Sequence, residues 1–522
     1  MEVKIQRLLR DGLILSARKY PDKIALLSEG QSVTYKKLLE DSLRIASVLV
    51  DIGVHRGDRV AVYMENSIPS ATAVYACMFA GAVFLFINPQ TKKEKLHFIL
   101  EDSDAKLLFA DQNLADNCFI SNHDAAKLEA VIINGELTKK QFSTITTLEY
   151  DKIVLENKIL TEPIFLIPND LAAFIYTSGS TGVPKGVMQT NHAMVFVATS
   201  IAEYLRLSRT DKILLVLPLA FDYGLYQLLM SVNLGALLVM EKSFTYPGRI
   251  YATIREQEVT VFPGVPTIFA TMVSSYKKSG ISFPSVTRVT NTAAALPEEF
   301  LSHMRGLFPE ALIFKMYGLT ECKRVAYLDP ALLDAKPGSV GKAIPGTEVF
   351  ILRTDGSSAL PNEAGILHVR GPHVMAGYWK RPEQTERMLR PGPVPGEKML
   401  CTQDLMRMDE DGFLYFVGRT DDIIKTRGEK VSPVEIETVI YSLESVKEVV
   451  VLGYPDKLLG EGIRAFVVPI EGEKITIPEI KQVCLRKLEN FMVPQDVVIL
   501  DSIPVLPNGK INRKKLVLWK EE

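Results

Sequence analysis

The residues with the clearest chemical potential form a loop rich in glycine and hydroxyl groups, YTSGSTGVPKGV over 176–187. Few bulky side chains obstruct its backbone, so its N–H groups and hydroxyls can surround a phosphate, and Lys185 adds a positive charge. The apolar run LAAFIY (171–176) predicts a buried strand before the loop, and we expect a helix from near His192. Strand, loop and helix together are typical of phosphate binding. A flexible linker is the simpler alternative.

The spacing within this loop differs from the Walker pattern, in which Gly and four further residues precede Gly-Lys and then Ser or Thr. Here Pro184 precedes Lys185 and Gly186 follows it. No hydroxyl therefore occupies the magnesium-binding place, and the spacing excludes P-loop enzymes, kinases of that type included.

The loop resembles the signature loop of the adenylate-forming superfamily, which comprises acyl-CoA synthetases, luciferases and peptide-synthetase adenylation domains. This resemblance implies ATP as co-substrate and Mg²⁺ as its companion. It assigns ATP binding to seven residues of the loop: Thr177, Ser178, Gly179, Ser180, Thr181, Gly182 and Lys185.

A second segment, YGLTE from Tyr317 to Glu321, follows the loop in the order that the superfamily has. In similar enzymes the tyrosine stacks on adenine, the threonine (Thr320 here) contacts the α-phosphate and the glutamate helps to hold Mg²⁺. The residue types suit these roles, because a planar ring pairs with a purine and a carboxylate is a hard ligand for a hard cation. Without the loop, the same five residues could form any turn.

A third segment, residues 402–437, resembles the part of the superfamily that binds ribose and joins the two domains. The resemblance implies that Asp404 accepts hydrogen bonds from the ribose hydroxyls, that Arg419 adds a ribose contact and that Asp421 is the hinge. Gln403 stands where relatives usually have glycine. The alternative for Arg419 and Asp421 is a surface salt bridge, which contributes little by itself.

A fourth segment, LPNGKINRKKL (506–516), matches the superfamily at Lys510. A lysine on a mobile domain can neutralise charge on both the attacking carboxylate and the α-phosphate, so we predict that Lys510 is catalytic together with Thr320 and Glu321. A solvated lysine is the alternative.

The segment LPLAFDYGL (217–225) bears on the substrate. CoA ligases for simple acids often have His where Phe221 stands, whereas peptide-synthetase adenylation domains have Phe-Asp, and their Asp binds the α-amino group. Phe221 and Asp222 reproduce that pair and are our predicted substrate-binding residues. A buried carboxylate needs a cation, which an ammonium substrate would supply. Alternatively, Asp222 caps a helix that begins at Tyr223.

The resemblance therefore implies an AMP-forming acid–thiol ligase. Our first interpretation is a stand-alone enzyme that adenylates an amino acid and transfers it to the phosphopantetheine of a carrier protein. Cys322 and Lys323, directly after YGLTE, are similar to residues of enzymes that load proline, so proline or a similar small apolar amino acid is the expected substrate. The alternative is an acyl-CoA or aryl-CoA ligase that uses free CoA. A non-enzymatic ATP-binding protein is the third class.

The composition of the chain is that of an ordinary globular protein. It has 522 residues, 47% of them hydrophobic, and a net charge of −2, which predicts neither a nucleic-acid nor a membrane partner. The five cysteines form no CxxC pair, and the N-terminus lacks a signal-peptide core, so we expect a cytoplasmic location. The uncharged run 67–90 is interrupted by Gly81 and predicts a buried helix followed by a strand.

The elements that must position these groups alternate between helix and strand through most of the first 350 residues, as in α/β folds. We expect strands at 59–64, 106–110, 130–134, 212–218, 236–240 and 259–264. We predict a large N-terminal domain, residues 1–420, with two α/β subdomains and, after Gly338, a small β-barrel or antiparallel unit. A small, mobile α+β domain is predicted over residues 421–522.

Overall fold

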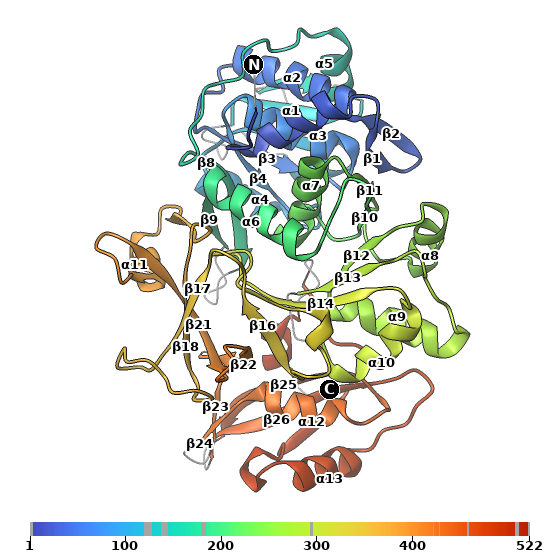
Figure 1. Cartoon of the computed structure of the whole chain (residues 1–522), viewed down its shortest axis with the longest axis vertical. Coiled ribbons are helices and arrows are strands. Elements are labelled where there is room, and N and C mark those ends of the chain that lie inside the picture. Colours follow the sequence, from blue (N-terminus) through green and yellow to red (C-terminus); the bar gives the residue numbers. More distant parts are fainter. Residues whose placement is uncertain are drawn as a thin grey trace. The chain divides into compact units, whose positions relative to one another are not determined.

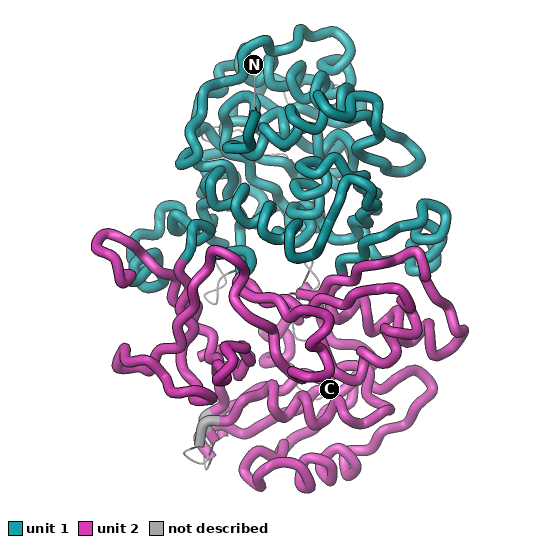
Figure 2. Tube along the Cα trace, in the orientation of Figure 1, with its two compact units in different colours: residues 1–263, 319–324, 371–390 teal, residues 264–318, 325–370, 391–522 magenta. Residues whose placement is uncertain are grey.

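A computed structural model describes residues 4–118, 128–136, 145–178, 184–292, 296–420, 422–426, 429–456, 459–506 and 511–519. The chain divides into two compact units, shown in Figure 2. Unit 1 comprises residues 1–263, 319–324 and 371–390, and unit 2 comprises residues 264–318, 325–370 and 391–522. This division into compact units does not test the domain boundary that we expect between residues 420 and 421. That boundary stays a prediction.

Unit 1 contains an 8-stranded sheet whose central strands are parallel (Figure 1). In spatial order its strands are β19 (Gly377–Tyr378), β9 (Pro184–Thr190), β8 (Leu171–Ser178), β4 (Val83–Phe86), β3 (Arg59–Tyr63), β5 (Ala105–Asp111), β6 (Ala130–Asn134) and β7 (Thr146–Glu149). The strands expected at 59–64, 106–110 and 130–134 are therefore confirmed. So is the strand before the glycine loop, which runs two residues further than predicted.

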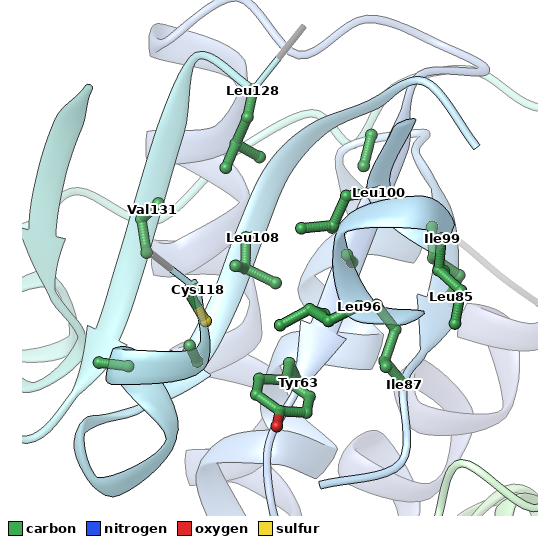
Figure 3. Close-up of a cluster of buried hydrophobic side chains, with 14 of the residues drawn as sticks. Tyr63, Leu85, Ile87, Leu96, Ile99, Leu100, Leu108, Cys118, Leu128 and Val131 are labelled. Carbon is green, nitrogen blue, oxygen red and sulfur yellow. The ribbon is translucent and has the colours of Figure 1, made fainter. Parts of the chain in front are cut away.

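One face of this sheet packs against α4 (Lys93–Asp102) through the apolar cluster in Figure 3. Leu96, Ile99 and Leu100 of α4 belong to the same cluster as Tyr63 and Leu108 of the sheet. Each side chain is at most 6% exposed. Burial of this extent stabilises the sheet. Phe174 of β8 belongs to the same cluster and Met188 of β9 packs against it, so the two strands that flank the glycine loop are held by this core.

The strand expected before the loop and the helix expected from near His192 are both present, but the prediction missed an element between the loop and the helix. A second strand, β9, follows the loop and pairs antiparallel with β8 before α6 (Asn191–Tyr204) begins. Thr190 caps α6 by accepting a hydrogen bond from the Ala193 N–H. The chain therefore passes from the loop segment into β9, and α6 follows β9.

A second sheet region of unit 1 carries α7 (Asp222–Leu234), the helix that begins at the predicted substrate-binding pair. Its strands run parallel in the order β10 (Lys212–Leu215), β11 (Leu237–Met240) and β1 (Ile24–Ser28), and β2 (Gln31–Thr34) pairs antiparallel with β1. Gly235 ends α7 with φ 72°, a left-handed conformation that favours glycine, so the apolar run 223–240 divides there as the residue pattern predicts.

Gly224 lets the first turn of α7 pack closely on the preceding backbone. A Cβ at this position would lie 2.3 Å from the Pro218 carbonyl oxygen. We therefore expect Gly224→Ala to lower the free energy of unfolding by about 1–3 kcal/mol, measured by urea unfolding. The control is Gly248→Ala, near the start of α8 (Pro247–Glu256), where a Cβ meets nothing within 4 Å. A Gly224→Ala variant as stable as this control would contradict the prediction.

The remaining helices of unit 1 have ordinary lengths. They are α1 (Leu9–Lys19), α2 (Tyr35–Asp51), α3 (Ile68–Phe79), α5 (Tyr150–Glu156) and α11 (Pro382–Met388). Together with β4, α3 accounts for the uncharged run 67–90 as predicted. Across the described part of the chain, no helix combines the length and the apolar character needed to cross a membrane.

Unit 2 contains a mixed sheet in which β13 and β14 are parallel and the strands beyond β14 are antiparallel. In order they are β13 (Arg288–Asn291), β14 (Leu312–Tyr317), β15 (Ala326–Leu328), β16 (Ser339–Ala343), β22 (Leu414–Arg419), β21 (Lys398–Met408), β18 (Gly365–Arg370) and β17 (Glu348–Leu352). The helices of this region are α9 (Pro266–Ser279) and α10 (Glu298–Leu307). The antiparallel strands expected after Gly338 are present.

The final part of unit 2 has its own 5-stranded sheet and apolar core. Its strands are β23 (Ile424–Thr426), β24 (Glu429–Val431), β25 (Val446–Asp456), β26 (Gly460–Pro469) and β27 (Asp496–Ile499), and its helices are α12 (Pro433–Tyr441), α13 (Ile477–Lys487) and α14 (Arg513–Val517). These elements form the α+β region predicted after residue 420. The chain is a mixed α/β protein, as its sequence predicts.

Candidate active site

The hairpin of β8 and β9 holds the two ends of the glycine loop. Its register pairs Thr177 with Lys185 and Ser178 with Pro184. Four predicted phosphate ligands, Gly179, Ser180, Thr181 and Gly182, lie outside the described residues, as does the side chain of Ser178. Their roles stay predictions, and the described flanks fix where the loop leaves and rejoins the sheet.

Lys185 and Glu321 meet through Tyr378, a residue that the sequence analysis missed. The Lys185 ammonium lies 3.9 Å from the centroid of the Tyr378 ring, a cation–π contact. The Tyr378 hydroxyl donates a hydrogen bond of 2.6 Å to Glu321 Oε1. Tyr378 reaches this place because β19 pairs antiparallel with β9, which aligns it with Val187.

The backbone around Thr320 and Glu321 is tied to the same strands. The Gln189 side chain on β9 donates a hydrogen bond of 3.2 Å to the Thr320 carbonyl oxygen. The Met375 N–H donates one of 2.8 Å to the Glu321 carbonyl oxygen. Unit 1 therefore brings together Lys185, Thr320 and Glu321, three residues that the sequence places far apart.

The Glu321 carboxylate has the chemistry of a magnesium ligand. The Tyr378 hydroxyl donates a hydrogen bond to one of its oxygens, which orients the group. Among the described residues, no group of three or more His, Cys, Asp or Glu side chains could hold a metal ion. Mg²⁺ typically takes one or two carboxylates and completes its shell with phosphate oxygens and water, so a single carboxylate fits an ion that arrives with ATP.

In unit 2, Asp404 joins the two other predicted nucleotide contacts. The Tyr317 hydroxyl donates a hydrogen bond to Asp404 Oδ2, and Arg419 Nε lies 3.2 Å from Asp404 Oδ1. β21 and β22 place Asp404 directly opposite Arg419. Asp404 is 6% exposed, whereas the Arg419 side chain is 51% exposed. A buried carboxylate beside a tyrosine ring is a suitable acceptor for a vicinal diol.

The backbone of Gln403 has a conformation that favours glycine, the residue that the family resemblance leads us to expect before this aspartate. Its φ is 62°, in the left-handed region that costs energy for a residue with a Cβ. The backbone at Gln403 is therefore strained. Asp404, the next residue, nevertheless contacts Tyr317 and Arg419.

Asp222 lies at the start of α7 and already has a cation within its own chain. Its Oδ1 accepts a hydrogen bond of 2.9 Å from the Tyr223 N–H, and α7 begins at Asp222 with Phe221 as its N-cap. Lys323 Nζ lies 3.7 Å from Asp222 Oδ2, and the two side chains are 3% and 14% exposed. Burial lowers the pKa of Lys323, and the carboxylates of Asp222 and Glu321 oppose this shift.

This ion pair corrects the reasoning from the sequence about Asp222. That reasoning required an ammonium group of the substrate as the missing cation, and Lys323 supplies one instead. The two remaining predicted residues, Lys510 and Asp421, lie outside the described residues, so their roles as catalyst and hinge stay predictions.

Comparison with known proteins gives consistent matches over nearly the whole chain. The family model described as AMP-binding enzyme matches residues 15–379, and the one described as AMP-binding enzyme C-terminal domain matches residues 435–510. The chain is 30% identical to a long-chain-fatty-acid–CoA ligase of Bacillus subtilis (strain 168), with 98% of this chain and 94% of that protein covered.

Solved structures agree with this match. The o-succinylbenzoate CoA synthetase from Bacillus subtilis, in complex with its acyl-adenylate intermediate, is 29% identical with a TM-score of 0.83 and covers 98% of both chains. A structure of the same synthetase with ATP and a magnesium ion is 29% identical with a TM-score of 0.80, and the match covers 97% of this chain and 98% of that one.

Proposed function

The chain belongs to the AMP-binding enzyme family and is an AMP-forming acid–thiol ligase, and from this premise we propose that it is an acyl-CoA or aryl-CoA ligase that uses free CoA. The relatives compared above are named as CoA ligases or synthetases and match almost end to end. The Lys323–Asp222 ion pair is the observation on this chain that supports the proposal, because it removes the need for an ammonium substrate. These findings favour the alternative of the sequence analysis over proline activation and carrier-protein loading.

The proposed reaction has two half-reactions. The carboxylate of the acid attacks the α-phosphorus of ATP, the bond to pyrophosphate breaks, and an acyl-adenylate remains. The thiolate of CoA then attacks the acyl carbonyl carbon, and AMP leaves with the bonding electron pair. Neither step needs a covalent intermediate on the protein, so the residues contribute positioning and charge stabilisation.

Each candidate residue has a role in the first half-reaction. Lys185 and the loop would hold the β- and γ-phosphates, and Thr320 and Lys510 would contact the α-phosphate as charge moves onto its oxygens. Glu321 would hold the Mg²⁺ that accompanies ATP, an ion that neutralises phosphate charge when it is bound. Asp404 and Tyr317 would bind ribose and adenine.

Tyr378 is proposed as a positioning residue for Glu321, and its hydroxyl gives a direct test. We expect Tyr378→Phe to lower the rate of ATP–pyrophosphate exchange by about 10-fold and to raise the Mg²⁺ concentration needed for half of the maximal rate, because the Glu321 carboxylate loses its anchor. Phe keeps the aromatic face against Lys185, so the ATP concentration for half-maximal rate should change little. An unchanged Mg²⁺ dependence would contradict the role.

The acceptor is tested by competition between two thiols. Purified enzyme is incubated with ATP, Mg²⁺ and a panel of fatty, aromatic and amino acids, with either free CoA or a phosphopantetheine-bearing carrier protein. We expect AMP to form together with a CoA thioester of a fatty or aromatic acid. Transfer of proline to the carrier protein, with free CoA inactive, would overturn the proposal and restore the first interpretation of the sequence.

A further inference from the structure

Lys323 is a buried lysine in an unusual backbone position. It is 6% exposed and has φ 62°, a left-handed conformation that few lysines adopt. The turn before it is closed by the Cys322 N–H, which donates a hydrogen bond of 3.0 Å to the Leu319 carbonyl oxygen. The turn over residues 319–322 holds the Lys323 backbone in this strained conformation. In that conformation the Lys323 ammonium lies near the Asp222 carboxylate.

The Lys323 ammonium does not use its hydrogen-bonding capacity within the described part of the chain. It has three N–H donors, and its Nζ atom is buried without a hydrogen-bond partner among the described residues. Asp222 Oδ2, at 3.7 Å, is too distant for a direct hydrogen bond. The hydroxyl of Tyr226, one helical turn after Asp222 on α7, is buried and likewise has no partner among the described residues. Unmet donors in such surroundings are costly unless a ligand or a buried water molecule satisfies them.

Lys315 shows how a buried lysine is satisfied elsewhere in the same chain. It is 5% exposed, and its Nζ donates a hydrogen bond to Glu298 Oε1. Comparable burial at Lys315 comes with a direct hydrogen bond, whereas the described residues supply no acceptor within hydrogen-bond distance of the Lys323 ammonium.

We propose that Lys323 and Asp222 together bind a hydroxyl group on the acyl part of the substrate, which makes Lys323 a specificity-determining residue. This inference rests on the proposed function. The pair is close to neutral in total charge, so a second carboxylate or an ammonium group would bring an unbalanced charge to a buried place. A hydroxyl adds no charge, donates to Asp222 Oδ2 and accepts from Lys323 Nζ, and it can thereby bridge two atoms 3.7 Å apart.

The test compares matched acids on matched variants. Benzoic and hexanoic acids are each compared with their hydroxy derivatives and with a dicarboxylic acid of similar length, and CoA-thioester formation is measured. The double variant Asp222→Asn/Lys323→Met keeps the approximate volume and the acceptor for the Tyr223 N–H but removes both charges. The control double variant is Glu298→Gln/Lys315→Met, which removes an ion pair that is already hydrogen-bonded.

We expect the unchanged enzyme to prefer one hydroxylated acid over its parent by about 10-fold or more in kcat/KM, and the double variant at Asp222 and Lys323 to lose that preference. Equal values for every pair, or a preference for the dicarboxylic acid, would overturn the inference while the ligase activity itself stands. If the preference survives in the double variant, Lys323 is not its source and the inference fails.

Thermal unfolding of the substrate-free variants tests the role of the pair independently of activity. Removing an unsatisfied buried charge pair should raise the melting temperature, whereas the control double variant should lower it. A melting temperature lowered by Asp222→Asn/Lys323→Met would assign the pair a structural role and overturn the inference. If no acid is converted to a CoA thioester, the proposed function fails, and the melting temperatures still distinguish a ligand-binding Lys323 from a structural one.

Discussion

Replacing Lys510 with alanine is expected to lower the rate of acyl-adenylate formation by about 10²–10³-fold. The side chain is predicted to neutralise charge that develops on the α-phosphate as the acid attacks, a contribution that matters only while that bond forms. The measurement is ATP–pyrophosphate exchange with a saturating acid. The same variant, given preformed acyl-adenylate and CoA, should make the thioester at close to the unchanged rate, because the second half-reaction does not use that charge.

Lys515→Ala is the matched control for this prediction. Lys515 is an exposed lysine of the same C-terminal segment, on α14, and its removal should leave exchange unchanged. Circular dichroism should show the same fold for both variants. Exchange at the normal rate in Lys510→Ala would remove Lys510 from the catalytic residues and would leave the α-phosphate without its predicted lysine contact.

The second large effect is expected from Glu321→Gln, which should lower the exchange rate by about 10²-fold. Glutamine has nearly the same shape and can still accept the hydrogen bond from the Tyr378 hydroxyl, so the local structure should persist. It lacks the negative charge that a hard cation requires, so the variant should need a much higher Mg²⁺ concentration.

Comparison of Glu321→Gln with Tyr378→Phe separates the effect of the Glu321 charge from the effect of the hydrogen bond that orients its carboxylate. Both variants should shift the Mg²⁺ dependence in the same direction, and the loss of the charge should have the greater effect. If Glu321→Gln retained the normal exchange rate and Mg²⁺ requirement, Glu321 would be a structural acceptor for Tyr378 and the magnesium assignment would fail.

The strands that support the site could be predicted from local sequence, and their pairing could not. The apolar runs at 59–64, 106–110 and 171–176 are long and nearly unbroken, as parallel buried strands require. PKGVMQT, residues 184–190, mixes glycine, lysine and glutamine, and it becomes a strand because β8 and β19 bind its two edges. Tertiary pairing of this kind leaves little trace in the local pattern.

The motifs name candidate site residues one by one, and the structure adds the contacts among them. Tyr317 and Arg419 both contact Asp404 in unit 2, and their nucleotide-binding roles stay predictions. Tyr378 was missed because it lies far from the other motifs, and only the pairing of β19 with β9 carries it to Lys185 and Glu321.

Lys323 illustrates the limit of reading charge from sequence. The sequence predicts that a buried Asp222 needs a cation, but it does not indicate that Lys323 is that cation. The ion pair depends on a left-handed φ at Lys323, a conformation that residue type does not predict for lysine. The amino-acid substrate was inferred because Asp222 needs a cation, and Lys323 of the same chain supplies that cation.

Adenylation of a carboxylic acid by this chain, with transfer of the acyl group to CoA, can be tested by following labelled pyrophosphate and the nucleotide product together. With a fatty or aromatic acid present, we predict acid-dependent exchange of labelled pyrophosphate into ATP, and on addition of CoA one AMP for each acyl-CoA formed. Release of ADP and phosphate, or exchange supported by amino acids alone, would show that this chain is not an AMP-forming CoA ligase for fatty or aromatic acids.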